Sequence, residues 1–225
     1  MWHEHSGLDP CIEALAQDIT RQIQAHLQQA EVCSVALSGG RSPIPLFQRL
    51  AQADLEWSRV RLRLVDERYV PPDHPDSNER LVREHLLVGK AAAADFRGLY
   101  VPNTSIDVAV AQANADANGH PFHLAVLGMG DDGHTASLFP DAPQLDAALA
   151  REAACYLHVT PPVASHERIT MSLAALFSTQ RLLLYITGTQ KRRVFEMANQ
   201  GATRRLPISY VLAEPGVSLD VHWHA

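Results

Sequence analysis

The sequence contains no run of 18 apolar residues, and its N-terminus lacks the basic stretch and apolar segment of a secretory signal. These absences argue against a membrane-spanning helix and against export. Cysteine is scarce, and Cys11, Cys33 and Cys155 form no CxxC pair. We therefore expect three reduced, mostly packed thiols and a cytoplasmic location.

Positive charge is not in excess either. The chain has 19 Lys and Arg against 25 Asp and Glu, a net charge of −6, and aromatic residues make up only 6%. Nucleic acids and acidic membranes attract basic surfaces, so we expect no partner of either kind. Any anion-binding site must therefore be local.

No metal site is expected from the histidine pattern. His3 and His5, and likewise His222 and His224, have a spacing that places two imidazoles on one side of a strand. Each pair lies near a terminus and lacks a third convincing ligand, so neither predicts a metal site.

The rest of the composition is typical of a globular protein, with 46% hydrophobic and 20% charged residues. No repeat or Pro/Gly/Ser linker divides the chain, so residues 1–225 are expected to form a single domain, as a monomer or small homo-oligomer.

Helical and strand-like patterns alternate along the chain. Apolar residues recur at helical spacing in Ile12–Leu27 and Ile106–Ala117, and helix starts are predicted at Ser42-Pro43, Ser77 and Gly188-Thr189. Short apolar runs between them predict buried strands. This pattern predicts an α/β fold with a mainly parallel sheet and helices on both faces, in which ligands bind beyond the carboxyl ends of the strands. The predicted strands cover residues 32–37, 60–65, 122–127, 156–160, 181–187 and 217–223.

Two predicted loops at strand ends are rich in glycine. Ser38-Gly39-Gly40-Arg41-Ser42-Pro43 joins a strand to a helix start, where backbone amides attract an anion such as phosphate. Gly128 to Pro140 carries Asp132 and His134 among closely spaced glycines. Imidazole titrates near neutrality, so His134 is the strongest candidate for an acid/base group.

Two further loops carry charge. Asp66-Glu67-Arg68 follows the strand predicted at residues 60–65, although a solvated turn would also explain it. Gly188-Thr189-Gln190-Lys191 joins another predicted strand to a helix. Lys191 in this loop, and the isolated Arg168 elsewhere, are each a candidate phosphate ligand, although an exposed side chain without a ligand would also explain either residue. No Walker A, GxGxxG or GxSxG motif is present, so nucleotide binding and a serine nucleophile are disfavoured.

In this order, the motifs resemble those of the 6-phosphogluconolactonase family, which shares a fold superfamily with glucosamine-6-phosphate deaminases. The resemblance covers nearly the whole chain. It implies a Rossmann-like α/β fold, no cofactor, and hydrolysis of 6-phospho-D-glucono-1,5-lactone in the oxidative pentose phosphate pathway. The motifs that carry it are Ser38 to Pro43, Asp66-Glu67-Arg68 with Ser77-Asn78, Gly128 to Pro140, Arg168-Ile169-Thr170, and Gly188 with Lys191.

Lactone hydrolysis needs an activated water and a proton for the departing ring oxygen. We expect His134 to serve both steps, with Asp132 or Asp66 orienting it. Arg68 is expected to polarise the carbonyl or to reach the phosphate. The expected phosphate ligands are Gly39, Gly40, Arg41, Arg168 and Lys191.

Two alternatives remain open. A deaminase or isomerase of amino-sugar phosphates would have an Asn-Glu-Pro sequence after the Gly-His motif, where this chain has Leu138-Phe139-Pro140. A non-catalytic sugar-phosphate sensor would be expected to carry an output module, and the chain leaves little room for one.

Overall fold

The computed structural model describes residues 1–163 and 165–225. Within these residues the strands form one seven-stranded sheet, in the order β1-β10-β9-β6-β2-β3-β5, and one three-stranded sheet, in the order β4-β8-β7. The strands are β1 (Trp2–His5), β2 (Cys33–Leu37), β3 (Val60–Leu64), β4 (Asp66–Arg68), β5 (Asp95–Phe96), β6 (Leu124–Leu127), β7 (Tyr156–Val159), β8 (Arg168–Met171), β9 (Arg181–Thr187) and β10 (Leu219–His224). The α-helices are α1 (Leu8–Leu27), α2 (Ile44–Leu50), α3 (Asn78–His85), α4 (Ile106–Ala117), α5 (Leu145–Leu149), α6 (Leu173–Ser178), α7 (Gly188–Ala198) and α8 (Ile208–Ala213).

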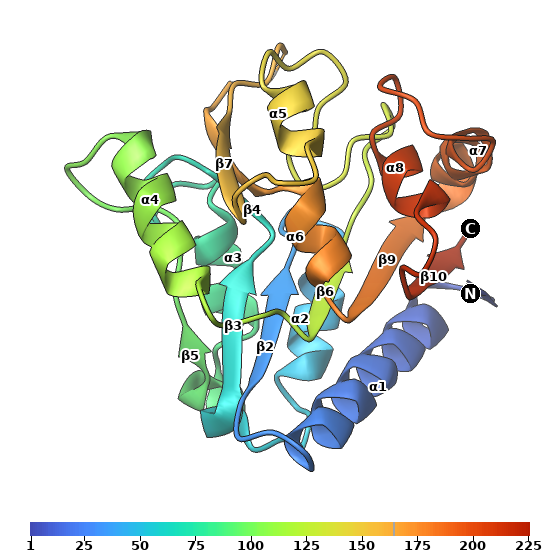
Figure 1. Cartoon of the computed structure of the whole chain (residues 1–225). Helices are drawn as coiled ribbons and strands as arrows, with labels where there is room; N and C mark the ends of the chain where they lie inside the picture. Colours follow the sequence, from blue (N-terminus) through green and yellow to red (C-terminus); the bar gives the residue numbers. More distant parts are fainter. Residues whose placement is uncertain (164) are drawn as a thin grey trace.

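Every strand pair of the larger sheet is parallel, which confirms the predicted α/β class. All residues of β2 and of β6 are buried. Because successive side chains of a strand point to opposite faces, helices or loops must cover both faces of the sheet. The arrows of β2, β6 and β9 run in the same direction in Figure 1, so the loops that follow them meet at one edge.

Charged residues in β3 are explained by their partners on α4 and β5. Arg63 is buried, and its Nε donates to Asp116 Oδ2 at 2.6 Å while Nη1 donates to the backbone oxygen of Asp95 at 2.8 Å. The guanidinium is thus paired as a buried charge must be, and the strand keeps its place in the sheet.

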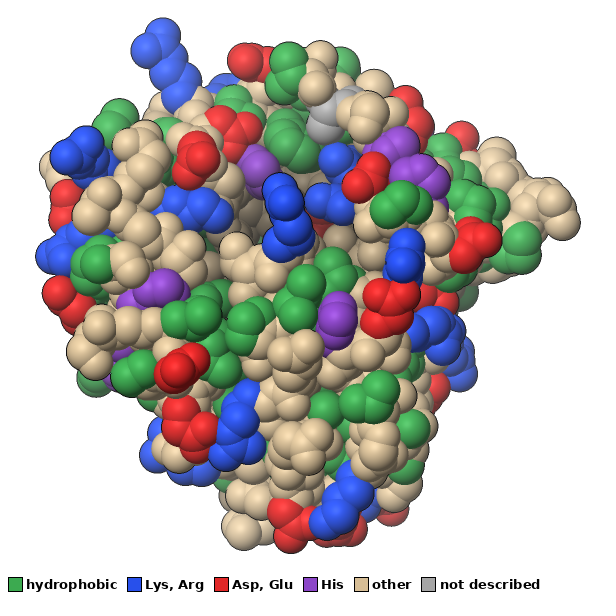
Figure 2. Space-filling model, turned by 180° about the vertical axis from the view of Figure 1, so that it is seen from behind, with side chains coloured by type: hydrophobic (Ala, Val, Ile, Leu, Met, Phe, Trp, Pro, Cys, Tyr) green, Lys and Arg blue, Asp and Glu red, His purple; other side chains and the backbone are tan. Residues whose placement is uncertain are grey.

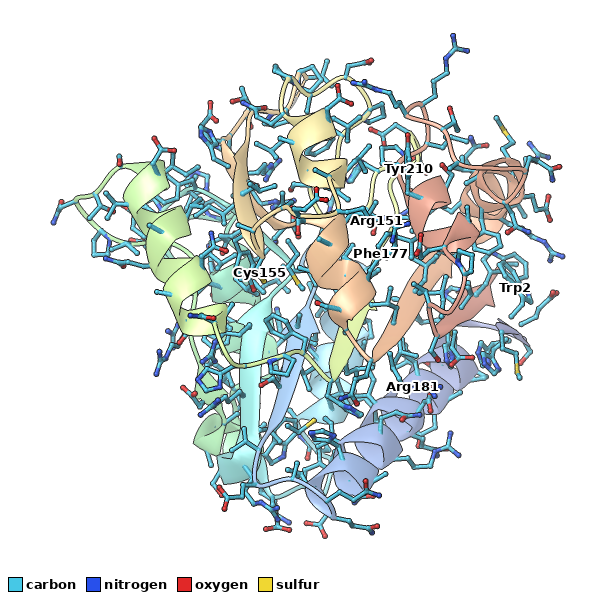
Figure 3. All side chains as sticks on the ribbon, viewed as in Figure 1. Trp2, Arg151, Cys155, Phe177, Arg181 and Tyr210 are labelled. Atoms are coloured by element: carbon cyan, nitrogen blue, oxygen red, sulfur yellow. The ribbon has the colours of Figure 1, made fainter. Side chains whose placement is uncertain are left out.

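The helices α5, α6 and α8 pack together beside the larger sheet. Figure 3 shows Arg151 and Phe177 close together, and the Arg151 guanidinium carbon lies 5.1 Å from the centre of the Phe177 ring. Arg151 also forms a two-pronged ion pair with Glu214, which follows α8. No helix in the described part of the chain is both long and apolar enough to span a bilayer.

Some predictions of local structure were wrong. Asp66-Glu67-Arg68 is not a loop but strand β4, which pairs antiparallel with β8. The strand predicted at 156–160 is confirmed as β7, but it belongs to this second, antiparallel sheet and not to the parallel one. Three residues are too few to show a strand pattern, and the antiparallel partner lies about a hundred positions away. Ser42 does not cap a helix, since α2 is capped at Pro43 without a side-chain bond.

Candidate active site

A cleft of about 250 Å³ lies at the carboxyl ends of β2, β6 and β9. Figure 2 shows a hollow on the rear face of the molecule, with basic side chains at its edge. The cleft combines residues of all four segments singled out in the sequence. Of the predicted site residues, Gly39, Gly40, Asp66, Arg68, His134 and Lys191 line it.

The histidine on the cleft wall is paired with one carboxylate. Nδ1 of His134 lies 2.6 Å from Oδ1 of Asp132, and the His134 backbone N–H donates to the same oxygen at 3.1 Å. Partial burial raises the pKa of Asp132, but the hydrogen bond and charge of His134 outweigh it and lower that pKa below its usual value. An ionised carboxylate only accepts hydrogen bonds, so the imidazole carries its proton on Nδ1 and leaves Nε2 as a base.

Gly130 leaves space for this pair. A Cβ at Gly130 would lie 2.3 Å from both Cε1 and Nδ1 of His134 and 2.6 Å from Asp132 Oδ1. The Gly130 backbone N–H also donates to the His134 oxygen at 2.9 Å. Residue 130 must therefore be glycine, because the Cβ of any other residue would collide with the imidazole of His134.

The second candidate carboxylate has a different partner. Asp66 is buried, and its Oδ2 accepts a hydrogen bond from Ser137 Oγ at 2.6 Å. The Ser137 backbone N–H donates to Thr170 Oγ1 at 3.0 Å. These bonds connect the loop that carries His134 to strands β4 and β8 of the smaller sheet. Asp66 therefore anchors this loop through Ser137, whereas Asp132 contacts the imidazole.

Glu67, next along β4, is a fully buried carboxyl that organises the start of α3. It accepts hydrogen bonds from the backbone N–H groups of Arg68, Asn78 and Glu79 and from Ser77 Oγ. Burial raises the pKa of Glu67 to about 7, although the three backbone bonds act to lower it. Glu67 is not among the described residues that line the cleft, and its hydrogen bonds join the backbone of Arg68 to the first turn of α3.

The Gly-Gly loop is held against β4 by Asn78. The Asn78 side chain donates from Nδ2 to the backbone oxygen of Asp66 at 2.8 Å, and a Cβ at Gly39 would lie 1.9 Å from Asn78 Oδ1. The loop backbone thus packs closely on the Asn78 side chain because residue 39 has no side chain of its own. Arg41 is exposed and is not among the described residues that line the cleft.

The predicted cations occupy three different settings. Arg68 lines the cleft, and its Nη1 donates to the backbone oxygen of Asp76 at 2.6 Å. Arg168 lies opposite Arg68 across the β4–β8 ladder and is buried, with Nε and Nη1 lacking any partner among the described residues. Burial and the charge of Arg68 lower the pKa of Arg168. Lys191 lines the cleft from the first turn of α7.

Several lining residues were not proposed from the sequence. Asn78 appeared only as part of a motif, and Tyr185 and Thr187 belong to a strand predicted for its apolar pattern alone. Thr187 is the last residue of β9, so its place at a carboxyl strand end was the available signal.

Comparison with known proteins agrees with this geometry. Residues 8–223 match the family described as Glucosamine-6-phosphate isomerases/6-phosphogluconolactonase. A curated 6-phosphogluconolactonase of Neisseria meningitidis serogroup A is 40% identical over 99% of this chain and 98% of its own length. The corresponding protein of Pseudomonas aeruginosa is 40% identical over 93% of this chain and 89% of its own.

Solved structures give the same picture. A 6-phosphogluconolactonase from Shewanella baltica superposes with a TM-score of 0.95 at 36% identity, covering 100% of this chain and 97% of the other. A monomeric glucosamine-6-phosphate deaminase has a TM-score of 0.80 at 15% identity, covering 99% and 96%. The second likeness is one of fold alone.

Proposed function

The chain belongs to the family of glucosamine-6-phosphate isomerases and 6-phosphogluconolactonases, and we propose that it hydrolyses 6-phospho-D-glucono-1,5-lactone to 6-phospho-D-gluconate with His134 as acid and base. This is a reaction of the oxidative pentose phosphate pathway. The observation that carries the proposal is the His134–Asp132 pair on the wall of a cleft that also holds Arg68 and Lys191.

Because Asp132 holds the proton of His134 on Nδ1, the other ring nitrogen, Nε2, is available as the base for hydrolysis. Nε2 of His134 accepts a proton from a water molecule as the water oxygen bonds to the lactone carbonyl carbon. The resulting imidazolium is stabilised by the Asp132 carboxylate. When the tetrahedral intermediate collapses, the bond to the ring oxygen breaks and the same Nε2 returns the proton to that oxygen. The imidazole ends neutral, so no cofactor is needed to balance the reaction.

Negative charge on the carbonyl oxygen requires a cation or donor nearby. Arg68 is the guanidinium that lines the cleft, and its bond to the Asp76 backbone fixes it in place. We assign Arg68 to the carbonyl oxygen. A buried arginine with unpaired N–H groups costs free energy unless a ligand supplies acceptors, which favours Arg168 as an anion ligand. Arg168 is not among the described residues that line the cleft, so it would reach the ligand from beside Arg68, its partner across the β4–β8 pair.

The phosphate anchor completes the proposal. The backbone amides of Gly39 and Gly40, with Arg41, Arg168 and Lys191, are assigned to the 6-phosphate. A dianion held away from the carbonyl positions the reacting end without changing its chemistry. The lining position of Gly39, Gly40 and Lys191 supports this assignment directly, whereas Arg41 would have to fold over the ligand from its exposed position.

Phe139, which lies five residues after His134, argues against a deaminase. Phe139 is buried, and its ring centre lies 4.5 Å from that of His134. An apolar ring therefore packs on the imidazole where a deaminase would present a carboxylate.

The proposed activity is tested with lactone generated from glucose 6-phosphate by glucose-6-phosphate dehydrogenase. Its disappearance is followed with the purified protein, without protein, and with the His134→Ala variant at equal concentration. Only the wild-type protein should accelerate hydrolysis above the spontaneous rate. Equal rates in all three samples would contradict the proposal.

We further propose that the chain acts as one domain in the cytoplasm, as a monomer or small homo-oligomer. One continuous core joins residues from α1 to β10, which supports a single folding unit. Burial raises the pKa of Cys11 to about 11 and of Cys33 and Cys155 to about 12, so these thiols are poorly reactive and suit a reducing compartment. Light scattering during gel filtration measures the oligomeric state.

A further inference from the structure

Two loops on the rim of the cleft bring a pair of histidines and an aspartate together. Oδ2 of Asp76 lies 3.0 Å from Nε2 of His166 and 3.9 Å from Nδ1 of His74. One possible ligand atom from each of the three residues lies within 4.8 Å of the other two. His74 and Asp76 precede α3, and His166 lies ninety residues from Asp76, just before β8.

This donor set matches what zinc-like ions prefer. Imidazole nitrogen and carboxylate oxygen are common zinc ligands, with bond lengths near 2.0–2.2 Å. Tetrahedral coordination at these bond lengths separates neighbouring ligand atoms by about 3.3 Å. The observed spacings bracket this value, so small rotations of the exposed Asp76 and the half-buried histidine side chains would close the site. Two imidazoles and one carboxylate leave a fourth position for water.

The surrounding backbone holds the ligands in place before any ion arrives. The Pro71 backbone oxygen accepts from the His74 N–H at 2.9 Å, and the His74 oxygen accepts from the Ser77 N–H at 3.0 Å. The two loops are joined directly, because the Tyr69 N–H donates to the Glu167 oxygen at 2.8 Å. An ordered backbone lowers the entropy cost of assembling three ligands.

We propose that His74, Asp76 and His166 form a binding site for one divalent transition-metal ion of the zinc class on the rim of the cleft. The bound ion would link the loop before α3 to the loop before β8. Arg68 lines the cleft and donates to the Asp76 backbone oxygen, so the ion site lies next to the cleft. None of the three proposed metal ligands is assigned a role in hydrolysis, so the existence of the site does not depend on the proposed function.

One contact limits the affinity. The Asp76 backbone N–H donates to His74 Nδ1 at 3.1 Å, so a metal ion on that nitrogen must displace this bond. The site is therefore expected to bind more weakly than a structural zinc site and to exchange its ion.

The experiment is a calorimetric titration of the full chain with Zn²⁺ alone, repeated for His74→Ala, His166→Ala and a matched control. His158→Ala is the control, because His158 also contacts carboxylates, those of Glu167 and Asp107, but without a second histidine. The wild type and the control should bind one ion with equal affinity. Each of the two ligand variants should lose at least about tenfold in affinity, as metal-site partners do when removed.

A second measurement identifies the ligands. Co²⁺ substituted into the site should give the visible absorption of a tetrahedral nitrogen and oxygen environment, absent from His166→Ala. Far-UV circular dichroism checks that both variants are folded. Unchanged zinc affinity in His74→Ala and His166→Ala, or loss of binding in His158→Ala, would overturn the proposal. Neither result bears on lactone hydrolysis, which is measured separately without metal.

Discussion

Nδ1 of His134 lies 2.6 Å from Oδ1 of Asp132, two residues earlier in the same loop. The carboxylate therefore fixes both the orientation of the ring and the nitrogen that carries the proton. The relation settles which of the nearby carboxylates contacts the imidazole, since Asp66 is engaged with Ser137 instead.

Replacing His134 by Ala removes the proposed acid and base. Turnover should fall by roughly 10² to 10⁴-fold, the usual contribution of such a group. Binding of the product 6-phosphogluconate should change little, because the phosphate ligands lie on other loops. Steady-state kinetics and product titration measure the two effects, and wild-type turnover in the variant would refute the assignment.

Asp132→Asn tests the orienting role. An amide can donate to Nδ1 and so favour the wrong tautomer, and turnover should fall about 10- to 100-fold, as when the partner of a functional imidazole is removed. The adjacent Asp131→Asn changes the same charge without touching that pair and should stay near wild type. Equal losses in both variants would show a general effect of charge.

Gly130→Ala introduces a methyl group where the imidazole lies. The His134–Asp132 pair has to move, and turnover should fall at least about tenfold, since misplacement by 1 Å can cost a hundredfold. Gly7 is the control, because a Cβ there also meets no atom within 4 Å and Gly7 does not line the cleft. Gly7→Ala should retain most activity, and a loss equal to that of Gly130→Ala would contradict the steric explanation.

The phosphate anchor predicts that 6-phosphogluconate binds far more tightly than gluconate. Lys191→Met should weaken binding of the phosphorylated compound by about tenfold or more while leaving gluconate unaffected, because a charge-assisted hydrogen bond contributes about 1.5–3 kcal/mol. Competitive inhibition of lactone hydrolysis supplies both constants. Equal affinity of the two compounds for the wild type would exclude the anchor.

Glu67 predicts a pH dependence of stability. Its pKa is about 7 in the folded protein and lies near 4.5 in the absence of burial, so the folded state binds the proton more tightly between these values. Compared with a protein that has a non-titrating residue at position 67, the free energy of unfolding therefore falls as the pH rises from about 4.5 to 7. The fall is on the order of 3 kcal/mol.

Glu67→Gln provides the non-titrating comparison. The amide cannot accept all four hydrogen bonds, so the variant is destabilised at every pH. The difference in unfolding free energy between wild type and variant should favour the wild type more at pH 5 than at pH 8. Urea denaturation at both values measures it, and a difference that does not change with pH would refute the raised pKa.

The predicted helices and buried strands depended on local patterns, which is why they were accurate. The helix predicted over Ile106–Ala117 is α4 to the residue, and Ser77 caps α3 as expected, its side chain accepting from the Arg80 N–H. Periodicity and capping act over a few residues, so one stretch of sequence contains the whole signal.

The antiparallel sheet could not be predicted in this way. The residues of β4 pair with β8, and Asp66 lies opposite Thr170. The interaction that makes Asp66-Glu67-Arg68 a strand is supplied by a distant segment. Its own three charged residues are more typical of a turn.

By itself, the sequence determined the α/β class, the loop that carries His134 and the family resemblance, because glycine spacing and apolar periodicity are local properties of the chain. Only the tertiary structure decided that Asp132 contacts the imidazole, that Asp66 instead accepts from Ser137, and that Asn78 packs against Gly39. These choices depend on distances of a few ångströms between segments up to seventy residues apart. Side-chain hydrogen bonds act over such distances only after the strands have brought their carboxyl ends to one edge of the sheet.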